Sequence, residues 1–321
     1  MTSRPDLSVV VPMHNASATI AKVVRSFVEI EQRSIEVIVV DDGSTDDSVK
    51  RVLAIDRPEV QVVGLGANAG AGIARNHGFA RAQGRYVLFF DADDQIHPGA
   101  LLNAVEALDD LGADAAIMPY RYRRGAARKS DGMNSYDTGV WSQYAVGPRR
   151  IARLGEVPRL LGFSNYPWNK LVRNDHYRRT GLRFGSTPVH NDILGHWLTL
   201  LDARALVLLD EPLCTHIVNE GGRHLTNRES SARLSLVAAL DETYTELAAR
   251  PEKRNRFSHH YWDFVLRVAS WATTRMAPDT VDEFNLRLQH HLLRIDLSDF
   301  TRMRLRRDPR LATRIIRKAL A

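Results

Sequence analysis

Residues 1–120 alternate short apolar runs with longer amphipathic stretches. This alternation is typical of β-strand and α-helix pairs that build a mostly parallel sheet. A helix is expected from about Ser17, where apolar residues recur at the three- and four-residue spacing of one helical face. Those residues are Ile20, Val23, Val24 and Phe27. The apolar runs predict buried strands at residues 7–11, 37–40, 60–63, 86–90 and 115–118, the first of them ended by Pro12.

Farther along the chain the pattern changes twice. Between about residues 121 and 158 the sequence is basic and rich in glycine, which predicts loop and short helix rather than sheet. From about residue 228 the apolar spacing becomes helical, and Pro251 and Pro278 separate the segments. The expected helices are 232–249, 257–273 and 281–293. We therefore expect an α/β domain at residues 1–225 and a helical region at 226–321.

The positive charge of the chain is concentrated at its end. The formal net charge is +6, and residues 300–321 alone carry eight Lys and Arg against Asp308. Because the rest is close to neutral, we expect no nucleic-acid partner. Apolar residues interleave with these arginines, which favours an amphipathic helix. It leaves open an anionic membrane surface, an anionic glycan, a homo-oligomer interface or plain solvation. The apolar residues are Met303, Leu305, Leu311, Ile315, Ile316 and Leu320.

Cysteine content and hydropathy bear on the compartment. The single cysteine, Cys214, excludes an intrachain disulfide and suits a reducing environment. No apolar run reaches the roughly 18–20 residues that a membrane span requires, and Met1–Asp6 lacks the features of a signal peptide. We expect a cytoplasmic protein, with the basic tail as the segment that could bring it to the inner face of the membrane.

Polar clusters follow four of the expected strands, at the point where each strand ends. In a parallel sheet the carboxyl ends of the strands lie at one edge, and ligands bind there. The four clusters are Pro12–Asn15, Asp41–Asp46, Gly66–Gly70 and Asp91–Asp94. Their coincidence predicts an active site at this edge.

The last cluster carries the sharpest chemistry. Asp91, Asp93 and Asp94 place three carboxylates directly after an apolar strand. Like charges this close repel each other unless a cation or protons neutralise them. Mg²⁺ and Mn²⁺ prefer oxygen ligands and are commonly held by one or two carboxylates together with substrate phosphates. The structural alternative is that Asp93 or Asp94 caps the helix expected near Pro98.

Four ordered motifs across about 90 residues resemble the family 2 glycosyltransferases of GT-A fold. They are Leu7–Asn15, Val39–Asp46, Asn68–Gly70 with Ala74–Asn76, and Gly84–Asp94. The resemblance implies a Rossmann-like, mostly parallel sheet flanked by helices. It also implies an inverting transferase that uses a nucleotide-diphosphate sugar, most often a UDP-sugar, with Mn²⁺ or Mg²⁺.

The same resemblance implies roles for single residues. Arg75 would approach the diphosphate and Asp91 the ribose, while Asp93 of the Asp-x-Asp motif would be the direct metal ligand. The residues expected to bind the nucleotide-sugar are Pro12, His14, Asn15, Asp41, Asn68, Arg75, Asp91 and Ala92.

An inverting transfer also needs a base opposite the leaving group, to take the proton of the acceptor hydroxyl. By the resemblance, Asp192 fills this role, with Asn191 at a position where the family commonly has Glu. It remains open whether Asp192 only caps a helix at 193–202. His190 is the reserve candidate for the base.

Two more segments resemble the family. Pro167–Leu171 is similar to its Trp-x-Lys-Leu segment, which lies beneath the sugar and acceptor. It implies that Trp168 and Lys170, together with Asn191, face the acceptor, unless the Trp168 ring is buried in the core. In Thr215–His224, the resemblance implies that His216 completes the metal shell. It also implies that Arg223 or His224 closes over the phosphates.

The resulting hypothesis is transfer of a hexose or an N-acetylhexosamine from a UDP-sugar onto a hydroxyl of a bacterial cell-surface glycan or lipid-linked precursor. One alternative is a nucleotidyltransferase, although the expected early loop rich in glycine and bearing Arg and Lys is absent. The other is a non-catalytic nucleotide-sugar or glycan-binding protein derived from a transferase, which Asn191 favours. A dehydrogenase is disfavoured, because Gly64, Gly66 and Gly70 depart from the dinucleotide spacing.

Overall fold

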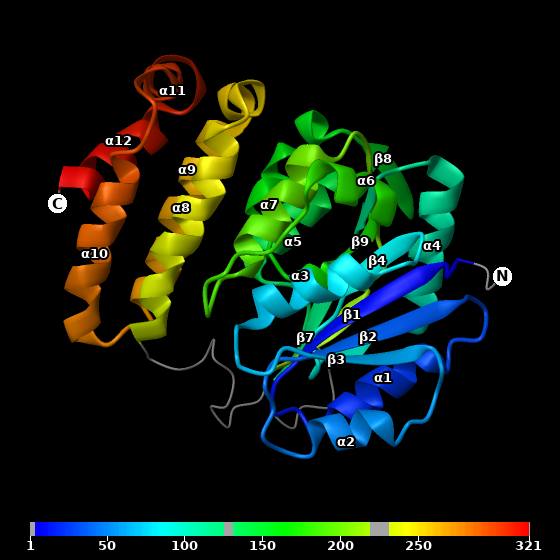
Figure 1. Cartoon of the computed structure of the whole chain (residues 1–321). Helices are drawn as coiled ribbons and strands as arrows, with labels where there is room; N and C mark the ends of the chain where they lie inside the picture. The colour runs from blue at the N-terminus through cyan, green and yellow to red at the C-terminus, as the bar shows by residue number, and fades with distance from the viewer. Residues whose placement is uncertain (1–3, 125–130, 219–230, 321) are drawn as a thin grey trace.

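The computed structural model describes residues 4–124, 131–218 and 231–320 (Figure 1). The strands of these residues form a large sheet of order β3-β2-β1-β4-β9-β6-β10-β8 and a small sheet of order β5-β11-β7. Their bounds are β1 Leu7–Met13, β2 Ile35–Asp41, β3 Val60–Gly64, β4 Tyr86–Phe89, β5 Gln95–Ile96, β6 Ala115–Ile117, β7 Tyr120–Arg124, β8 Arg149–Ala152, β9 Lys170–Arg173, β10 Leu206–Leu209 and β11 Cys214–Val218.

The first half of the large sheet confirms the predicted parallel α/β arrangement. Strands β3, β2, β1 and β4 run parallel, and every residue of β1 is buried. A strand covered on both faces needs apolar side chains throughout, which the valine-rich runs supply. The expected end of the first strand was wrong, because β1 continues through Pro12 to Met13. Pairing of β1 with β4 stops at Val10, so the missing N–H of Pro12 removes no hydrogen bond on that side.

The second half of the sheet is mixed. Strand β9 lies antiparallel between β4 and β6, and β8 lies antiparallel to β10. In the segment 121–158 we expected loop and short helix, and α5 (Ser135–Tyr144) is the helix. The segment also contains β8 and all but the first residue of β7, which we did not expect. Both strands form sheet edges. An edge strand keeps one side in contact with water, so it does not need the apolar run that marks a central strand.

Helices cover the large sheet on both sides (Figure 1). Helix α3 packs on β1 and β2, α1 packs on β2, and α4 packs on β6, β9 and β10. The predicted face of α1 is confirmed, since Ile20, Val23, Val24 and Phe27 are buried. The helices of this part are α1 Ile20–Val28, α2 Ser48–Leu53, α3 Ala71–Arg81, α4 Pro98–Leu111, α5 Ser135–Tyr144, α6 Asn174–Thr180 and α7 Asp192–Asp202.

The predicted helical region follows as a separate layer, drawn yellow to red in Figure 1. Pro251 and Pro278 are the first residues of their helices, where a missing N–H costs no hydrogen bond. The boundary expected near residue 225 lies outside the described residues. This layer contains α8 Ser235–Ala248, α9 Pro251–Thr273, α10 Pro278–Leu292, α11 Leu297–Arg302, a π-helical turn at Met303–Arg307, and α12 Pro309–Leu320.

The basic tail is folded against this layer. Leu311, Ala312 and Ile315 of α12 are buried, and the helix contacts α9 and α10. The amphipathic helix predicted for the tail therefore exists, and much of its apolar face is already used inside the protein. Within the described residues, no helix combines the length and apolar character needed to cross a membrane.

We predict that Gly78→Ala destabilises the fold, because α3 approaches β1 through this glycine. A Cβ at Gly78 would overlap Cγ1 of the buried Val10. The expected loss of unfolding free energy is about 1–3 kcal/mol, measured by urea denaturation. Gly99→Ala is the matched helical control, since a Cβ there meets nothing within 4 Å. Its stability should stay within about 1 kcal/mol of the wild type, or rise; equal losses in both variants would contradict the close approach.

Candidate active site at the carboxyl edge of the sheet

The predicted clusters that follow β1, β2 and β3 lie together in the structure. Met13 pairs with Asp41, which in turn pairs with Gly64, so the three strands end at one edge. The Asn15 side-chain oxygen accepts hydrogen bonds from the backbone of Thr45 at 2.8 Å and of Asp46 at 3.3 Å. Gly43, at φ 73°, passes so close to the third loop that a Cβ would lie 2.9 Å from the Asn68 nitrogen. Contacts across the loops therefore hold this edge together.

Asp42 organises these loops, and sequence reasoning missed it. The side chain is buried and accepts hydrogen bonds from the backbone of Ala69 at 2.6 Å and of Gly70 at 2.9 Å. Its backbone oxygen bonds the Nδ1 of His14 at 2.8 Å. The Asp-Gly pair in the sequence signalled a turn, but it did not show that the carboxylate before the glycine would hold a second loop.

The residues expected to bind the nucleotide differ in their exposure. His14, Asn15 and Asn68 are exposed at the strand-end edge, and Asp41 is partly exposed. Pro12 and Ala92 are buried, so their side chains shape the edge from beneath. The Asn15 oxygen is already engaged by the Thr45 loop, which gives this residue a structural task as well.

Arg75 of α3 joins three segments that are far apart in the sequence. The buried guanidinium bonds Asp91 at 2.6 Å and the Asn191 side-chain oxygen at 2.9 Å. It lies over the ring of Phe184, 5.4 Å from the ring centroid. Gly72, one turn earlier in α3, approaches Gly185 so closely that a Cβ would overlap its carbonyl oxygen. The expected diphosphate contact therefore also links the strand-end edge to the segment before α7.

The carboxylates after β4 are crowded. Burial, reinforced by the charges of Asp94 and Asp91, raises the pKa of Asp93 to about 7. Burial also raises the pKa of Asp94, although His216 opposes that shift. Asp94 accepts hydrogen bonds from the Nδ1 of His216 at 2.8 Å and from the Ile217 nitrogen at 2.9 Å. Asp94 is thus an anchor for β11, a role that the helix-cap alternative did not foresee.

This donor set fits a divalent cation. Asp93 offers carboxylate oxygens in a site where neighbouring negative charge makes ionisation costly, and a cation would relieve that cost. The bond from Asp94 to Nδ1 fixes the orientation of His216 and leaves Nε2 as the ring nitrogen for coordination. No group of three protein ligands is assembled among the described residues, so diphosphate oxygens and water would supply the other positions.

Asp192 lies within reach of the same charges. It is the first residue of α7, and the Asn165 side chain donates a hydrogen bond to it. Burial raises the pKa of Asp192, while the charge of Arg75 acts in the opposite direction. Asn191 occupies the capping position at the start of α7, but its side chain makes no capping hydrogen bond there.

The expected acceptor side differs from the sequence analysis at Trp168. Trp168 is completely buried, so its ring has no free face for a pyranose. Tyr166 stacks on it at 4.5 Å with an interplanar angle of 10°, and its hydroxyl lies 3.0 Å from that of Tyr122. Both tyrosines are partly exposed, and both rings lie near the ring of His216. The exposed aromatic surface beside the carboxylates therefore comes from two tyrosines that the motif analysis did not single out.

Lys170 is buried beneath this surface. Its Nζ donates hydrogen bonds to the Tyr166 backbone oxygen at 2.7 Å and to the Asn169 side-chain oxygen at 2.5 Å. Burial lowers the pKa of Lys170 to about 7, and the charge of Asp192 opposes that shift. Lys170 thus supports the segment that carries Tyr166, rather than presenting its amine to an acceptor.

The remaining candidates do not join the cluster. The ring of His190 packs against Trp271 at 6.1 Å, and burial followed by the charge of Arg233 lowers its pKa to about 4. It faces the helical layer, which disfavours it as the reserve base. Arg223 and His224 lie outside the described residues.

Comparison with known proteins agrees with the architecture. A family model described as glycosyl transferase family 2 matches residues 8–176. The succinoglycan biosynthesis protein ExoO of Rhizobium meliloti is 38% identical over 113 residues, which are 35% of this chain and 32% of that protein. The uncharacterized glycosyltransferase YibD of Escherichia coli is 27% identical over 270 residues, which are 80% of this chain and 73% of that protein.

Among solved structures, residues 1–349 of S. aureus TarS in complex with UDP-GlcNAc have the same fold. The TM-score is 0.76 at 20% sequence identity, and the superposition covers 98% of this chain and 88% of that one. The likeness thus extends through the helical layer, beyond the segment that the family model matches.

We predict that Asp42→Asn lowers the unfolding free energy by about 1–3 kcal/mol, because one of the two backbone N–H groups that donate to this buried carboxylate loses its charged acceptor. Urea denaturation measures the change. Asp47→Asn is the control, since Asp47 is exposed and makes no side-chain cap to α2. It should remain within about 0.5 kcal/mol of the wild type. An Asp42 variant as stable as this control would show that the loops hold without the carboxylate.

Proposed function

The chain belongs to glycosyl transferase family 2, and on that basis we propose the reaction that it catalyses. It transfers a hexose or an N-acetylhexosamine from a UDP-sugar, with inversion, onto a hydroxyl of a bacterial cell-surface glycan or a lipid-linked precursor. The TarS structure, which holds UDP-GlcNAc, supports the donor class. The relationship to ExoO, a succinoglycan biosynthesis protein, supports the acceptor class.

The observation that carries the proposal is the position of Arg75 between Asp91 and Asn191, next to Asp192. An inverting transferase must hold the leaving diphosphate and the acceptor base on opposite sides of one anomeric carbon. The Arg75 guanidinium contacts Asp91 on one side and Asn191 on the other. Its buried Nε makes no hydrogen bond with the described residues, so the protein alone does not saturate this guanidinium.

Donor binding would use the strand-end edge. His14, Asn15 and Asn68 offer polar groups for the uridine at the exposed rim. Asp93 and His216 would hold Mg²⁺ or Mn²⁺, with Asp94 fixing the imidazole. When bound, the cation supplies positive charge that stabilises the departing diphosphate.

Acceptor activation would fall to Asp192. The carboxylate takes the proton of the acceptor hydroxyl as that oxygen bonds to the anomeric carbon and the bond from this carbon to the diphosphate breaks. Burial makes the carboxylate a stronger base than an exposed one, because it raises the pKa. The charge of Arg75 opposes this rise, and the hydrogen bond from the Asn165 side chain orients the carboxylate.

Tyr122 and Tyr166 are the best candidates for contact with the acceptor. Their partly exposed rings lie beside His216, and Tyr166 is close enough to Asp192 for the charge of that carboxylate to act on its hydroxyl. Aromatic faces suit the apolar faces of pyranose rings.

Asn191, at a position where Glu was expected, favoured a binding protein without catalysis. Its side-chain oxygen accepts a hydrogen bond from Arg75, so this amide fills the site without adding a third negative charge. The contact removes the main argument for that alternative, and family membership disfavours the nucleotidyltransferase.

The donor assignment is tested by calorimetric titration of a panel of UDP-sugars, with and without Mn²⁺. We expect one of them to bind more tightly with the metal, and Asp93→Ala to lose about tenfold or more of this metal-dependent affinity. Asp47→Ala is the control, because it removes an exposed carboxylate that follows β2 in the chain, and it should bind the UDP-sugar like the wild type. If no UDP-sugar binds in the presence of metal, the proposed donor class is wrong.

The base assignment is tested by Asp192→Asn, which keeps the shape of the side chain. Transfer should fall by about 10²–10⁴-fold while donor affinity is retained, because only proton removal is lost. His190→Gln is the comparison and should keep most of the rate. The opposite pattern, with His190→Gln inactive and Asp192→Asn active, would move the base to His190.

A further inference from the structure

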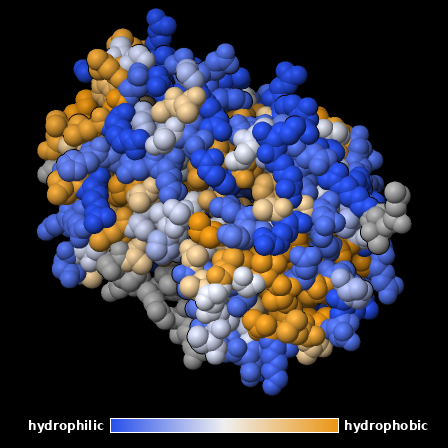
Figure 2. All heavy atoms as spheres, viewed as in Figure 1, coloured by the Kyte–Doolittle hydropathy of each residue, from blue (hydrophilic) through white to orange (hydrophobic). Residues whose placement is uncertain are grey.

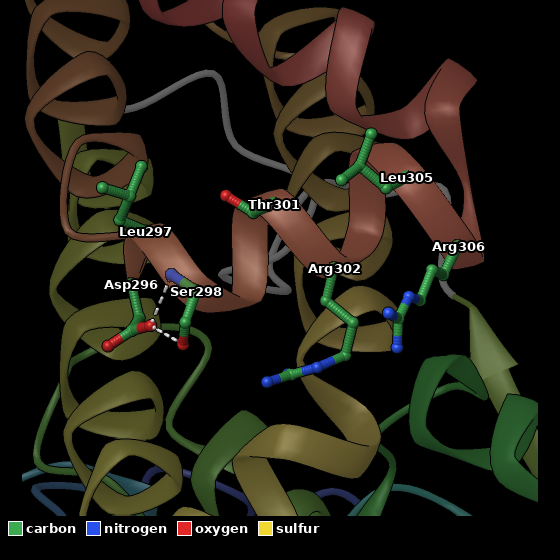
Figure 3. A pocket seen from close by; sticks show the side chains of 7 residues that line it. All are labelled: Asp296, Leu297, Ser298, Thr301, Arg302, Leu305 and Arg306. Atoms are coloured by element: carbon green, nitrogen blue, oxygen red, sulfur yellow. Dashed lines mark hydrogen bonds between the residues drawn. The ribbon is translucent and has the colours of Figure 1, made fainter.

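Two leucines of the C-terminal layer lie almost entirely in water. Leu297 is 77% exposed and Leu305 is 71% exposed. With Thr301 they recur every four residues along α11 and the π-helical turn, and both leucines extend to the same side in Figure 3. They line a hollow of about 670 Å³ together with Asp296, Ser298, Arg302 and Arg306.

Unpaired cations accompany these leucines. Arg304 and Arg306 are exposed and make no hydrogen bond or ion pair with any residue that the structure describes. Arg306 extends to the other side of the turn from Leu305 (Figure 3). Of the nearby acids, Asp299 pairs with Arg254 and Arg302, and Asp296 pairs with Arg254. Asp308 accepts a hydrogen bond from the Leu311 nitrogen at 2.9 Å. The positive charges of Arg304 and Arg306 are therefore not paired by any residue that the structure describes.

The fold accounts for this exposure. Met303 is the one buried residue of the π-helical turn, so the turn is fixed at that point while its other four residues face water. Leu311 and Ile315 of α12 are packed inside and cannot contact a partner. In Figure 2 hydrophobic and hydrophilic residues lie side by side over the end of the molecule where Figure 1 places α11 and α12.

We propose that Leu297, Leu305, Arg304 and Arg306, the leucine–arginine surface, dock the protein on a bilayer that contains anionic lipids. Exposed leucines gain free energy by entering the boundary between headgroups and acyl chains, and arginines gain by contact with lipid phosphates. The inference goes beyond the proposed function, since it concerns where the enzyme works rather than what it transfers.

Charge complementarity favours a lipid surface over the other occupants. A second copy docked through the same surface would bring two sets of unpaired arginines together, and like charges repel. A soluble anionic polymer would use the arginines but would leave both leucines in water. Only an anionic bilayer satisfies the apolar and the cationic groups at once.

The test is flotation of the full chain with vesicles. We expect the protein to float with equal parts phosphatidylcholine and phosphatidylglycerol, and not with phosphatidylcholine alone. Arg304→Gln with Arg306→Gln should weaken binding roughly tenfold or more, since each cation near such a surface contributes a several-fold effect. Leu297→Ser with Leu305→Ser should also weaken it. The matched control is Arg51→Gln with Leu53→Ser on α2, both exposed, with Leu53 at 63%.

The outcomes separate the possible partners, and none depends on turnover. A wild-type chain that ignores phosphatidylglycerol vesicles overturns the proposal, and so does a control that binds as weakly as the two test variants. Binding that needs the arginines but not the leucines would point to a soluble polyanion instead. Sedimentation of each variant completes the test, because a change of oligomeric state in the leucine variant would show that a second copy covers this surface.

Discussion

The guanidinium side chain of Arg75 lies almost completely out of water. A buried guanidinium is tolerated only where acceptors surround it, so its partners must be held in place. Asp91 comes from the end of β4, and Asn191 from the residue before α7. The need to pair this one cation therefore couples the half of the site expected to bind the donor to the half expected to activate the acceptor.

A second coupling runs through the carboxylates. Asp94 is buried and bonded to His216 and Ile217, which ties β11 of the small sheet to the loop that follows β4. Asp93 remains beside it with a raised pKa, because burial and two neighbouring acids make its charge costly. Neighbouring negative charge therefore makes ionisation of Asp93 costly, and a divalent cation bound together with a diphosphate would relieve that cost.

In the helical layer, some apolar and cationic residues are buried or paired, and others are exposed to water. Leu311, Ala312 and Ile315 of α12 are buried by packing on α9 and α10, whereas Leu297 of α11 and Leu305 of the π-helical turn are exposed. The arginines divide in the same way: Arg302 is paired with Asp299, and Arg304 and Arg306 have no partner among the described residues. Within the turn, Met303 is buried and the residues 304–307 that follow it are exposed.

The sequence by itself determined the parallel half of the sheet and the order of the strand-end clusters. A continuous apolar run such as Leu7–Val11 favours burial on both faces of a sheet. The turns that follow such runs depend on residues close in the sequence, so they can be predicted too. It did not determine that β7 and β8 form, that Trp168 is covered by Tyr166, or that Asp42 rather than Asp41 holds the third loop. It also could not pair Arg75 with Asn191, 116 residues away, or separate the buried leucines of the tail from the exposed ones. The periodicity of the sequence shows which residues favour burial. It does not show which residues they contact, because those contacts join segments far apart in the chain and depend on the tertiary structure.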